Sequence, residues 1–436
     1  MPTNFVLKNV QLSDGSTQDI QIQDDVIIAV SSSLSASSLD KAEVIECSGL
    51  VALPGFVDLH THLREPGFEQ SETVLTGTQS AALGGFTAVH AMANTMPVAD
   101  TAGVVEQVAS LGKEAGYADV YPIGAVTVGL DGKQLAELGA MANSKAKVKV
   151  FSDDGKCVHD PVIMRRALEY VKAFDGVIAQ HAQEPRLTEG AQMHEGAVSA
   201  ELGLTGWPAV AEESIIARDV LLAEHVDSRI HICHLSTKGS VEIIRWAKAR
   251  GIKVTAEVTP HHLLLTDDLA RSYDAIYKVN PPLRTADDVA ALREALIDGT
   301  IDIIATDHAP HPIESKDCEW NAAAFGMLGL ETAASIAQEV LIESGKSDWN
   351  RFSEVLSINP ARIAGDEQQG QNIEPGSIAN IVLIDPKVKR KVFAESASKS
   401  TNSPYVGLEL PGKVVHTIYR GFFTVRDSKL AKQGKR

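Results

Sequence analysis

The strongest constraint on the fold is a regular alternation through the middle of the chain, where short apolar, β-branched runs alternate with stretches of helical periodicity. Helical stretches include Glu72–Gly84, Pro161–Phe174, Glu213–His225, Lys238–Arg250 and Asp287–Asp298. Eight runs are predicted strands: Phe56–His60, Thr87–Met92, Asp119–Ala125, Lys147–Ser152, Gly176–His181, Arg229–Leu235, Lys253–Val258 and Ile301–Thr306. Eight β–α units predict an α/β fold of the (β/α)8 barrel type rather than a doubly wound sheet.

The two ends of the chain have a different pattern. Residues 3–53 contain short, loosely alternating apolar runs, and the far end is β-rich at Ile378–Ile384, Lys391–Phe393 and Val414–Val425. Neither end has enough chain to build a good sheet alone. We therefore expect both ends to pair into one small β-sandwich domain. The predicted boundaries are 1–53 and 366–436 for this composite domain and 54–365 for the barrel.

Charge and composition exclude several classes of partner. The chain of 436 residues has 57 acidic and 40 basic side chains, for a net charge of −17. This balance argues against binding to nucleic acid or to an anionic membrane surface, both of which require clustered Lys and Arg. A small anionic substrate remains compatible, because one local Arg outweighs a diffuse negative field at short range.

Cysteine spacing and the first residues indicate the compartment. The four cysteines lie far apart with no CxxC pair, which favours reduced thiols over disulfides. The opening MPTNFVLKNVQL lacks a basic region followed by an apolar run, and no stretch reaches the length of a membrane span. We therefore expect a cytoplasmic protein.

Residue types that bind metals or transfer protons occur at the ends of five of the predicted strands. They are Asp58-Leu59-His60-Thr61-His62, Ser152-Asp153-Asp154-Gly155, His181, His234 and Thr306-Asp307-His308-Ala309-Pro310-His311. Active sites of such barrels lie at the carboxyl ends of the strands, so these segments are expected to meet. Buried imidazoles and carboxylates are costly unless they are paired or bound to metal.

The composition of this set predicts a two-metal site. His60 and His62 are two residues apart, so in extended chain they point to the same side. Together with His181, His234 and two Asp, they offer too many ligands for one tetrahedral ion, but enough for two ions that share a bridging hydroxide. Imidazole and carboxylate ligands suit Zn²⁺ and similar ions. Such a centre attacks unreactive carbonyls, for example those of amides.

Several motifs resemble one known family. The segments Val57–Gly67 and Ala305–His311 resemble the signatures of dihydroorotases, which belong to the amidohydrolase superfamily, and Met92–Thr95, Lys278–Arg284 and Phe325-Gly326 also fit. The resemblance covers essentially the whole chain. It implies reversible cyclisation of N-carbamoyl-L-aspartate to L-dihydroorotate in pyrimidine biosynthesis.

The resemblance also implies roles for the metal ligands. His60 and His62 match ligands of the first metal ion, and His181 and His234 match ligands of the second. Asp307 matches a metal-bound carboxylate that transfers protons in catalysis. The expected cofactors are two divalent metal ions, with Zn²⁺ favoured.

The bridging ligand is left open between two neighbouring residues. Many superfamily members bridge their ions with a carboxylated Lys after the fourth strand, but here no Lys lies at that strand end. The sequence resembles the type I dihydroorotase variant, in which an Asp replaces the Lys. Spacing to His181 favours Asp154 over Asp153.

Substrate recognition is expected to depend on Arg64. Dihydroorotate carries a carboxylate, and a guanidinium offers it two parallel hydrogen bonds. Asn94 and His311 match further carboxylate contacts. Seven residues are expected to bind the substrate: His62, Arg64, Asn94, Asn280, His311, Phe325 and Gly326.

Other functions and assemblies remain open. Another cyclic amidohydrolase, such as a hydantoinase or allantoinase, is the main alternative, although Arg64 and the missing strand-four Lys favour dihydroorotase. A second alternative is an inactive scaffold partner of aspartate transcarbamoylase. We expect a homodimer and allow for association with that transcarbamoylase.

Overall fold

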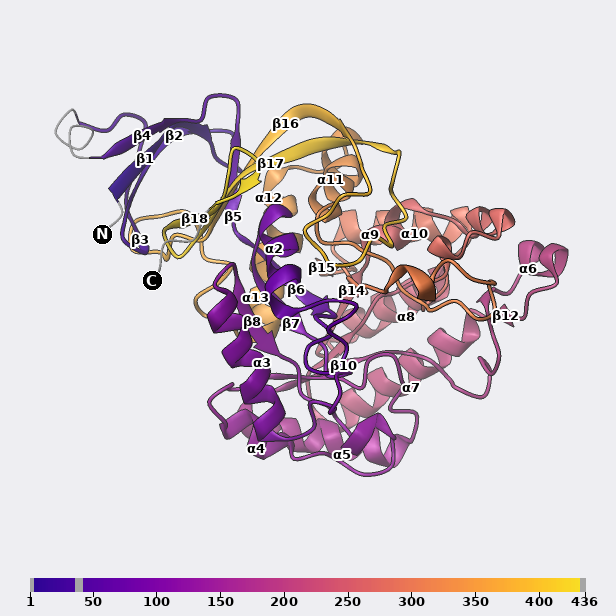
Figure 1. Cartoon of the computed structure of the whole chain (residues 1–436). Coiled ribbons are helices and arrows are strands. Elements are labelled where there is room, and N and C mark those ends of the chain that lie inside the picture. The colour runs from indigo at the N-terminus through magenta and orange to yellow at the C-terminus, as the bar shows by residue number, and fades with distance from the viewer. Residues whose placement is uncertain (1–3, 36–41, 432–436) are drawn as a thin grey trace.

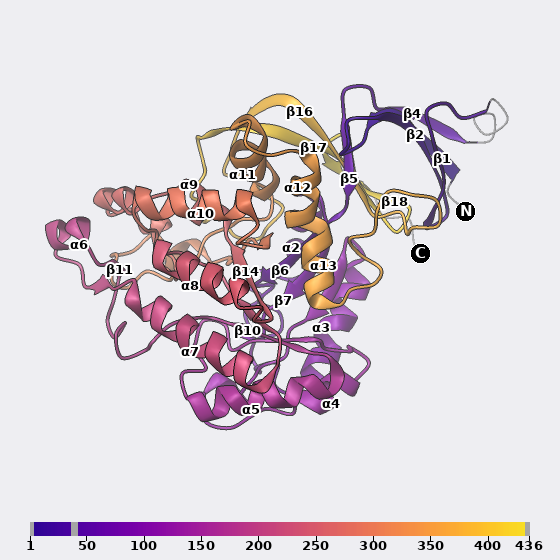
Figure 2. The ribbon, with the colours of Figure 1, turned by 180° about the vertical axis from the view of Figure 1, so that it is seen from behind.

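The computed structural model describes residues 4–35 and 42–431 of the chain (Figure 1). Its centre holds eight short parallel strands, and helices cover their outer side (Figures 1 and 2). These strands are β6 (Phe56–Thr61), β7 (Phe86–Ala91), β8 (Asp119–Pro122), β9 (Val150–Phe151), β10 (Val177–Gln180), β13 (Ile230–Ile232), β14 (Val254–Val258) and β15 (Ile303–Ile304).

The pairings of these strands form a complete circuit. β6, β7 and β8 make one sheet, and β9, β10, β13, β14 and β15 make a second sheet in that spatial order. Parallel bridges between Gly124 and Phe151 and between Thr61 and His308 connect the two sheets at their edges. All residues of β6, β7 and β10 are buried, as expected for parallel strands covered on both faces.

All eight predicted strands occur, but most are shorter than expected. β9 and β15 keep only two paired residues each, because the chain leaves the ladder to place polar side chains beyond the strand ends. The prediction that the fourth strand begins at Lys147 is wrong. Lys147 has a left-handed backbone (φ 52°), which breaks the extended conformation before β9.

The helices begin where the sequence supplies capping groups. Thr73 and Thr285 form capping boxes, and the Asp160 side chain accepts hydrogen bonds from the first turn of its helix. The larger helices are α2 (Val74–Leu83), α3 (Ala102–Ala115), α5 (Pro161–Val171), α7 (Val210–Val226), α8 (Lys238–Ala249) and α10 (Ala286–Asp298). Shorter elements are α4 (Leu138–Asn143), α6 (Ala197–Leu202), α9 (Pro260–Leu264), α11 (Ala333–Gln338), α12 (Trp349–Ser353), α13 (Asn359–Ala364), β11 (Met193–His194) and β12 (Gly206–Trp207).

Strands from both chain ends form a single nine-stranded sheet, as the expected pairing of the two ends requires. Its members are β1 (Asn4–Gln11), β2 (Thr17–Gln23), β3 (Val26–Ser31), β4 (Glu43–Glu46), β5 (Val51–Pro54), β16 (Ile381–Lys391), β17 (Glu409–Tyr419), β18 (Phe422–Arg426) and β19 (Lys429–Leu430). Antiparallel pairing of β5 with β16 joins the two ends. Residues from both, including Leu7 and Leu383, share one apolar core.

The long strands β16 and β17 also reach the central body. In Figure 1 they arch from the terminal sheet over the body toward α11. Thr417 of β17 donates a hydrogen bond to the Ala82 carbonyl in α2. The chain between β16 and β17 therefore contacts the loops that follow β6 and β15.

Two sequence predictions concern thiols and membranes. All four cysteines are free. Within residues 4–35 and 42–431, we find no helix with the length and apolar character needed to cross a membrane.

Candidate active site

Asp154 lies at the centre of the predicted metal ligands. Its Oδ1 is 3.2 Å from His60 Nε2, 3.3 Å from His181 Nδ1 and 3.4 Å from His234 Nε2. Its Oδ2 is 3.4 Å from His62 Nε2. All five side chains are buried. A carboxylate in contact with four imidazoles from three strand ends has the position expected of a shared metal ligand.

Asp307 lies beside this cluster. Its Oδ1 is 3.0 Å from His62 Nε2 and 3.4 Å from His60 Nε2. Asp307 and His234 have positive φ angles, 46° and 32°. Non-glycine residues in this region of backbone space are concentrated at functional sites, where surrounding contacts hold them. The local backbone therefore directs both side chains toward the cluster.

The charges in the cluster are strongly coupled. Burial alone would raise the pKa of the Asp154 carboxyl, but the surrounding imidazoles of His60, His181 and His234 hold that pKa well below its usual range. Burial alone would lower the pKa of His60, but Asp154, Glu257 and Asp307 raise it well above its usual value. The carboxylates therefore create a buried site that favours positive charge.

The donor atoms fit divalent metal ions. Two compact groups each bring three ligand atoms within 4.8 Å of one another: His60 with Asp154 and His234, and His60 with His62 and Asp307. His60 Nε2 and Asp154 Oδ1 are buried 3.2 Å apart, but neither atom makes a hydrogen bond. Unpaired buried polar atoms are costly, and imidazole nitrogen and carboxylate oxygen are good ligands for Zn²⁺.

The structure distinguishes the two neighbouring aspartates. The Asp153 carboxylate points away from the imidazoles and accepts hydrogen bonds from the backbone N–H groups of Val126 and Thr127, at 2.8 and 3.0 Å. It also accepts one from the Thr127 hydroxyl. Asp153 thus stabilises the neighbouring loop, while Asp154 contacts the histidines.

Arg64 and His311 form a second group next to the predicted metal ligands. Arg64 Nε donates to the Pro310 carbonyl at 3.2 Å, and its Nη2 lies 3.4 Å from His311 Nε2. His311 Nε2 donates to the Phe325 carbonyl at 2.8 Å. Burial and the nearby Arg64 lower the pKa of His311 to about 3, so this imidazole is neutral. Burial lowers the pKa of Arg64 to about 10, which leaves it cationic at neutral pH.

Gly326 lies close to His311. Its φ of 141° is a conformation that other residues rarely adopt, and a Cβ added there would lie 2.8 Å from His311 Nε2. Glycine is therefore required for the Phe325-Gly326 backbone to approach His311.

The predicted asparagines contact the metal ligands directly or through one residue. Asn94 Oδ1 is 3.0 Å from His62 Nδ1. Asn280 Nδ2 donates to Gln183 Oε1 at 3.2 Å, and the same oxygen is 2.8 Å from His181 Nε2. Asn94 and Gln183 therefore bind the ring nitrogens opposite those that face Asp154, an arrangement that orients metal-binding histidines.

The sequence is similar to proteins of one family. A family model described as dihydro-orotase-like matches residues 49–240. A dihydroorotase from Streptomyces coelicolor is 66% identical over 98% of this chain and 99% of its own length. One from Mycobacterium tuberculosis is 52% identical over 96% of this chain and 97% of its own length. The chain belongs to the dihydroorotase family.

Solved structures of related enzymes have the same fold as this dihydroorotase family member. L-hydantoinase (dihydropyrimidinase) from Arthrobacter aurescens has a TM-score of 0.88 at 25% identity, covering 99% of this chain and 98% of that chain. Dihydropyrimidinase from Brevibacillus agri NCHU1002 has a TM-score of 0.83 at 24% identity, covering 98% and 96%. The fold is thus of the amidohydrolase type.

Glu257 also belongs to the site of this dihydroorotase family member, although its sequence context did not predict it. It lies in β14, and its carboxylate is 2.6 Å from His60 Nδ1 and 2.9 Å from His231 Nε2. It also accepts the backbone N–H of His234 at 3.1 Å. A carboxylate within the apolar strand Val254–Val258 was an available signal, since it must be paired when buried.

Asp58 is a second supporting residue. Its carboxylate accepts the backbone N–H groups of His60 and Thr306, at 3.2 and 2.9 Å. It is fully buried, and that burial raises its pKa. Asp58 therefore ties the end of β6 to the end of β15, which carry His60, His62 and Asp307.

Proposed function

We propose that this chain is a dihydroorotase that interconverts N-carbamoyl-L-aspartate and L-dihydroorotate plus water, a step of pyrimidine (UMP) biosynthesis. The observation that carries the proposal is the position of Arg64, a cation suited to a carboxylate, two residues beyond the buried histidine–carboxylate cluster. Arg64 contacts the segment that follows Asp307: its Nε donates to the Pro310 carbonyl at 3.2 Å, and its Nη2 lies 3.4 Å from His311 Nε2. The names of the nearly full-length relatives support the same activity.

The proposal includes the domain organisation. In this proposal residues 54–365 form a closed (β/α)8 barrel, and residues 1–53 and 366–436 form one composite β-domain. The strands of that domain belong to a single nine-stranded sheet rather than to the two sheets of the expected β-sandwich. The circuit of eight parallel strands supports the barrel, and the antiparallel pairing of β5 with β16 supports the joining of the chain ends.

The proposed cofactors are two divalent metal ions, with Zn²⁺ favoured. His60 and His62 would hold one ion, His181 and His234 the other, and Asp154 would bridge them, with Asp307 as a further ligand. When bound, such ions supply acidification of a water molecule to a pKa of about 7 and polarisation of a carbonyl. The buried His60 Nε2 and Asp154 Oδ1, which lie 3.2 Å apart without a hydrogen bond, support this assignment.

Asp307 is the proposed catalytic residue. In ring opening, its carboxylate accepts the proton of the attacking water and then delivers it to the departing ring nitrogen. In ring closure the same transfers run in reverse: protonated Asp307 gives its proton to the departing carboxylate oxygen, and its carboxylate takes up the proton that the attacking nitrogen loses as the new carbon–nitrogen bond forms. The short distances from its Oδ1 to His62 Nε2 and His60 Nε2, 3.0 and 3.4 Å, support this role, since a general base must lie close to the atoms that exchange protons.

The remaining site residues are proposed to bind and orient the substrate. Arg64 forms a charge-assisted pair with the substrate carboxylate, and Asn94 and His311 add hydrogen bonds. Asn280 Oδ1 is buried without a partner and is available to an N–H group of the ring. The full proposed set is His62, Arg64, Asn94, Asn280, His311, Phe325 and Gly326.

The proposed setting is a homodimeric cytoplasmic enzyme that acts on a small anionic molecule, with aspartate transcarbamoylase as a possible assembly partner. Nucleic acid and membranes are not expected partners, in keeping with the net charge of −17.

A ring-opening assay on purified protein tests the function. We expect turnover of L-dihydroorotate, loss of activity after chelation and recovery on addition of Zn²⁺. Hydantoin and allantoin serve as competing substrates, and preferential turnover of either would instead support the cyclic amidohydrolase alternative. A protein that purifies without stoichiometric metal and lacks activity would support the inactive scaffold.

A further inference from the structure

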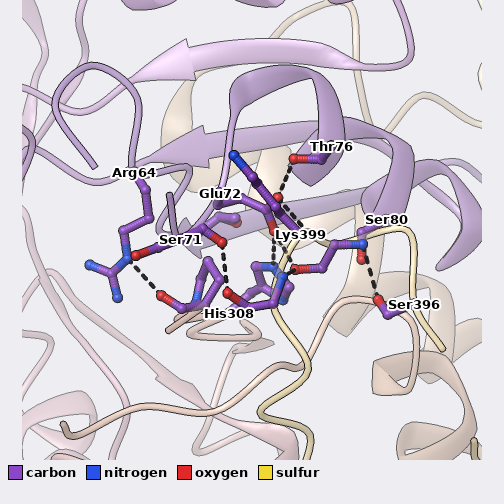
Figure 3. A network of polar contacts seen from close by, with 12 residues as sticks. Arg64, Ser71, Glu72, Thr76, Ser80, His308, Ser396 and Lys399 are labelled. Atoms are coloured by element: carbon purple, nitrogen blue, oxygen red, sulfur yellow. Dashed lines mark hydrogen bonds and ion pairs between the residues drawn. The ribbon is translucent and has the colours of Figure 1, made fainter. Parts of the chain in front are cut away.

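The connection between β16 and β17 contacts the loops of the proposed site although it is distant from them in sequence. Ser400 Oγ donates to the Ser71 carbonyl at 2.7 Å, and Lys399 Nζ donates to the Glu69 carbonyl at 2.6 Å. Figure 3 shows this network between the connection and the loop that follows Arg64. Residues Ser396–Asn402 are hereafter the β16–β17 segment.

Glu72 anchors one end of the β16–β17 segment. Its buried carboxylate accepts the Lys399 backbone N–H at 3.0 Å and the Ser398 hydroxyl. His308 Nε2 lies 3.4 Å from the same carboxylate, and the His308 carbonyl accepts the backbone N–H of His62. Although burial would raise the Glu72 pKa, these partners lower it, so the carboxylate is charged. The anchor is therefore continuous with the loop that carries Asp307.

Asn402, at the other end, uses all of its amide hydrogen-bonding groups on the substrate side of the site. Its Oδ1 accepts the backbone N–H of His311 at 3.1 Å. Its Nδ2 donates to the carbonyls of Ala309 and Gly326, at 2.9 and 3.2 Å. The Asn402 carbonyl accepts the N–H of Leu328 at 3.1 Å. The side chain is only 2% exposed.

These bonds connect two separate pieces of the substrate-binding surface. Ala309 and His311 follow β15, whereas Gly326 and Leu328 belong to the loop that returns toward α11. Since the His311 side chain also bonds the Phe325 carbonyl, the Asn402 amide fixes both the backbone and the direction of the imidazole. Arg64 lies against the His311 side chain, and Asn402, which follows β16, holds His311 in position.

We propose that Asn402 is a positioning residue for substrate binding, which holds His311 and Gly326 in the spacing that the substrate carboxylate and ring require. This inference rests on the proposed dihydroorotase function. Asn402 does not contact the metal ligands in this arrangement, so its contribution is to binding geometry rather than to proton transfer. If a substrate-binding group moves by about 1 Å, the enzyme binds its substrate much more weakly.

The test is a comparison of Asn402→Ala with Asn380→Ala. Asn380 is a matched control: it is 6% exposed, and its amide also bonds backbone groups, the Arg420 N–H and the Gln368 carbonyl, but in the terminal sheet. We expect Asn402→Ala to raise KM for dihydroorotate about tenfold or more, with a kcat within about threefold of wild type and unchanged metal content. Asn380→Ala should leave KM unchanged even where it lowers Tm equally.

A double-mutant cycle with His311→Ala separates positioning from general stability. If Asn402 acts through His311, adding Asn402→Ala to His311→Ala should change kcat/KM by less than about twofold. Where Asn402→Ala does not fold, Asn402→Asp provides the same test, because it retains the side-chain shape and the acceptor for His311 N–H but loses both donors. A wild-type KM in the Asn402 variant, an equal rise in KM for Asn380→Ala, or independent effects in the cycle would each overturn the proposal.

Failure of the underlying function is distinguishable. A wild-type protein that is inactive on dihydroorotate contradicts the proposed function, and amide hydrogen exchange then decides the role of Asn402. Faster exchange of residues 309–311 and 326–328 in Asn402→Ala than in Asn380→Ala supports positioning, whereas unchanged exchange there overturns it.

Discussion

The two halves of the proposed site are held in place by different means. In the metal-binding half, the ligands follow directly from buried strands, and a neighbouring side chain binds the second ring nitrogen of each of three histidines: Glu257, Asn94 and Gln183. In the substrate half, Arg64 and His311 lie on loops. Asn402, from a remote segment, binds the His311 backbone, and Arg64 lies against the His311 side chain.

The difference suits the two tasks of the proposed site, which are catalysis at the metal-binding half and substrate recognition at the loops. Strand ends in a closed circuit of parallel strands are rigid, so they suit ligands whose positions must hold within tenths of an ångström. Loops are more adaptable and accept the shape of a particular substrate. Changes in the metal-binding half should therefore affect kcat and metal content, and changes in the substrate half should mainly affect KM.

Removal of metal should have the largest effect. Because the buried carboxylates and imidazoles require a cation to compensate them, dialysis against a chelator should abolish ring opening, and Zn²⁺ should restore it. Metal content by elemental analysis should follow activity. Full activity at undetectable metal content would contradict the proposed metal dependence. The control is dialysis of the same protein without chelator.

Loss of the proton-transferring carboxylate should have the next largest effect. Asp307→Ala is expected to lower kcat by several orders of magnitude, at least about 10³-fold, while the far-UV circular dichroism remains that of wild type. Asp366→Ala removes a carboxylate that pairs with His90 away from the cluster and is the control. A near-normal rate in Asp307→Ala would show that another group moves the proton.

Substitution of Arg64 should distinguish recognition from chemistry. Arg64→Lys keeps the charge but loses the planar pair of donors, so KM for dihydroorotate should rise about 100-fold with a smaller change in kcat. Arg186→Lys, at an exposed arginine paired with Glu184, should have wild-type kinetics. An effect of Arg64→Lys confined to kcat would contradict the division between the two halves.

Loss of the negative charge of Glu257, which contacts His60, should have the smallest of these effects. Glu257→Gln is expected to weaken metal affinity about 10- to 100-fold, because the carboxylate orients the imidazole and increases its basicity. Competition with a metal-binding dye measures this directly. Glu224→Gln, which removes an exposed partner of Arg250, should leave the affinity unchanged. If both variants bind metal as tightly as wild type, Glu257 has only a packing role.

The parts that could be predicted from sequence are those with local signals. The eight strands were recognisable because buried parallel strands are continuous apolar runs. The residues that could be identified lie at or just beyond the end of such a run: His60, His62, His181, His234 and Asp307. Their assembly around Asp154 then follows from the circuit of strands.

Features without a local signal were missed or left open. Asp153 and Asp154 are adjacent and chemically identical, so only the backbone direction after β9 separates the loop carboxylate from the one among the histidines. Gln183 resembles any polar loop residue. Asn402 lies between two strands assigned to the terminal sheet, and nothing nearby in sequence indicates that its amide reaches His311.

The sequence by itself determined the order of strands and helices, the pairing of the chain ends and the residue types that collect at the strand ends, because hydrophobic periodicity and capping act over short distances along the chain. Only the tertiary structure decided which carboxylate lies among the imidazoles, which groups orient them and how the substrate-binding loops are held. Those outcomes depend on hydrogen bonds between residues far apart in sequence, whose directions are set when the strand circuit closes and β16 and β17 extend over it.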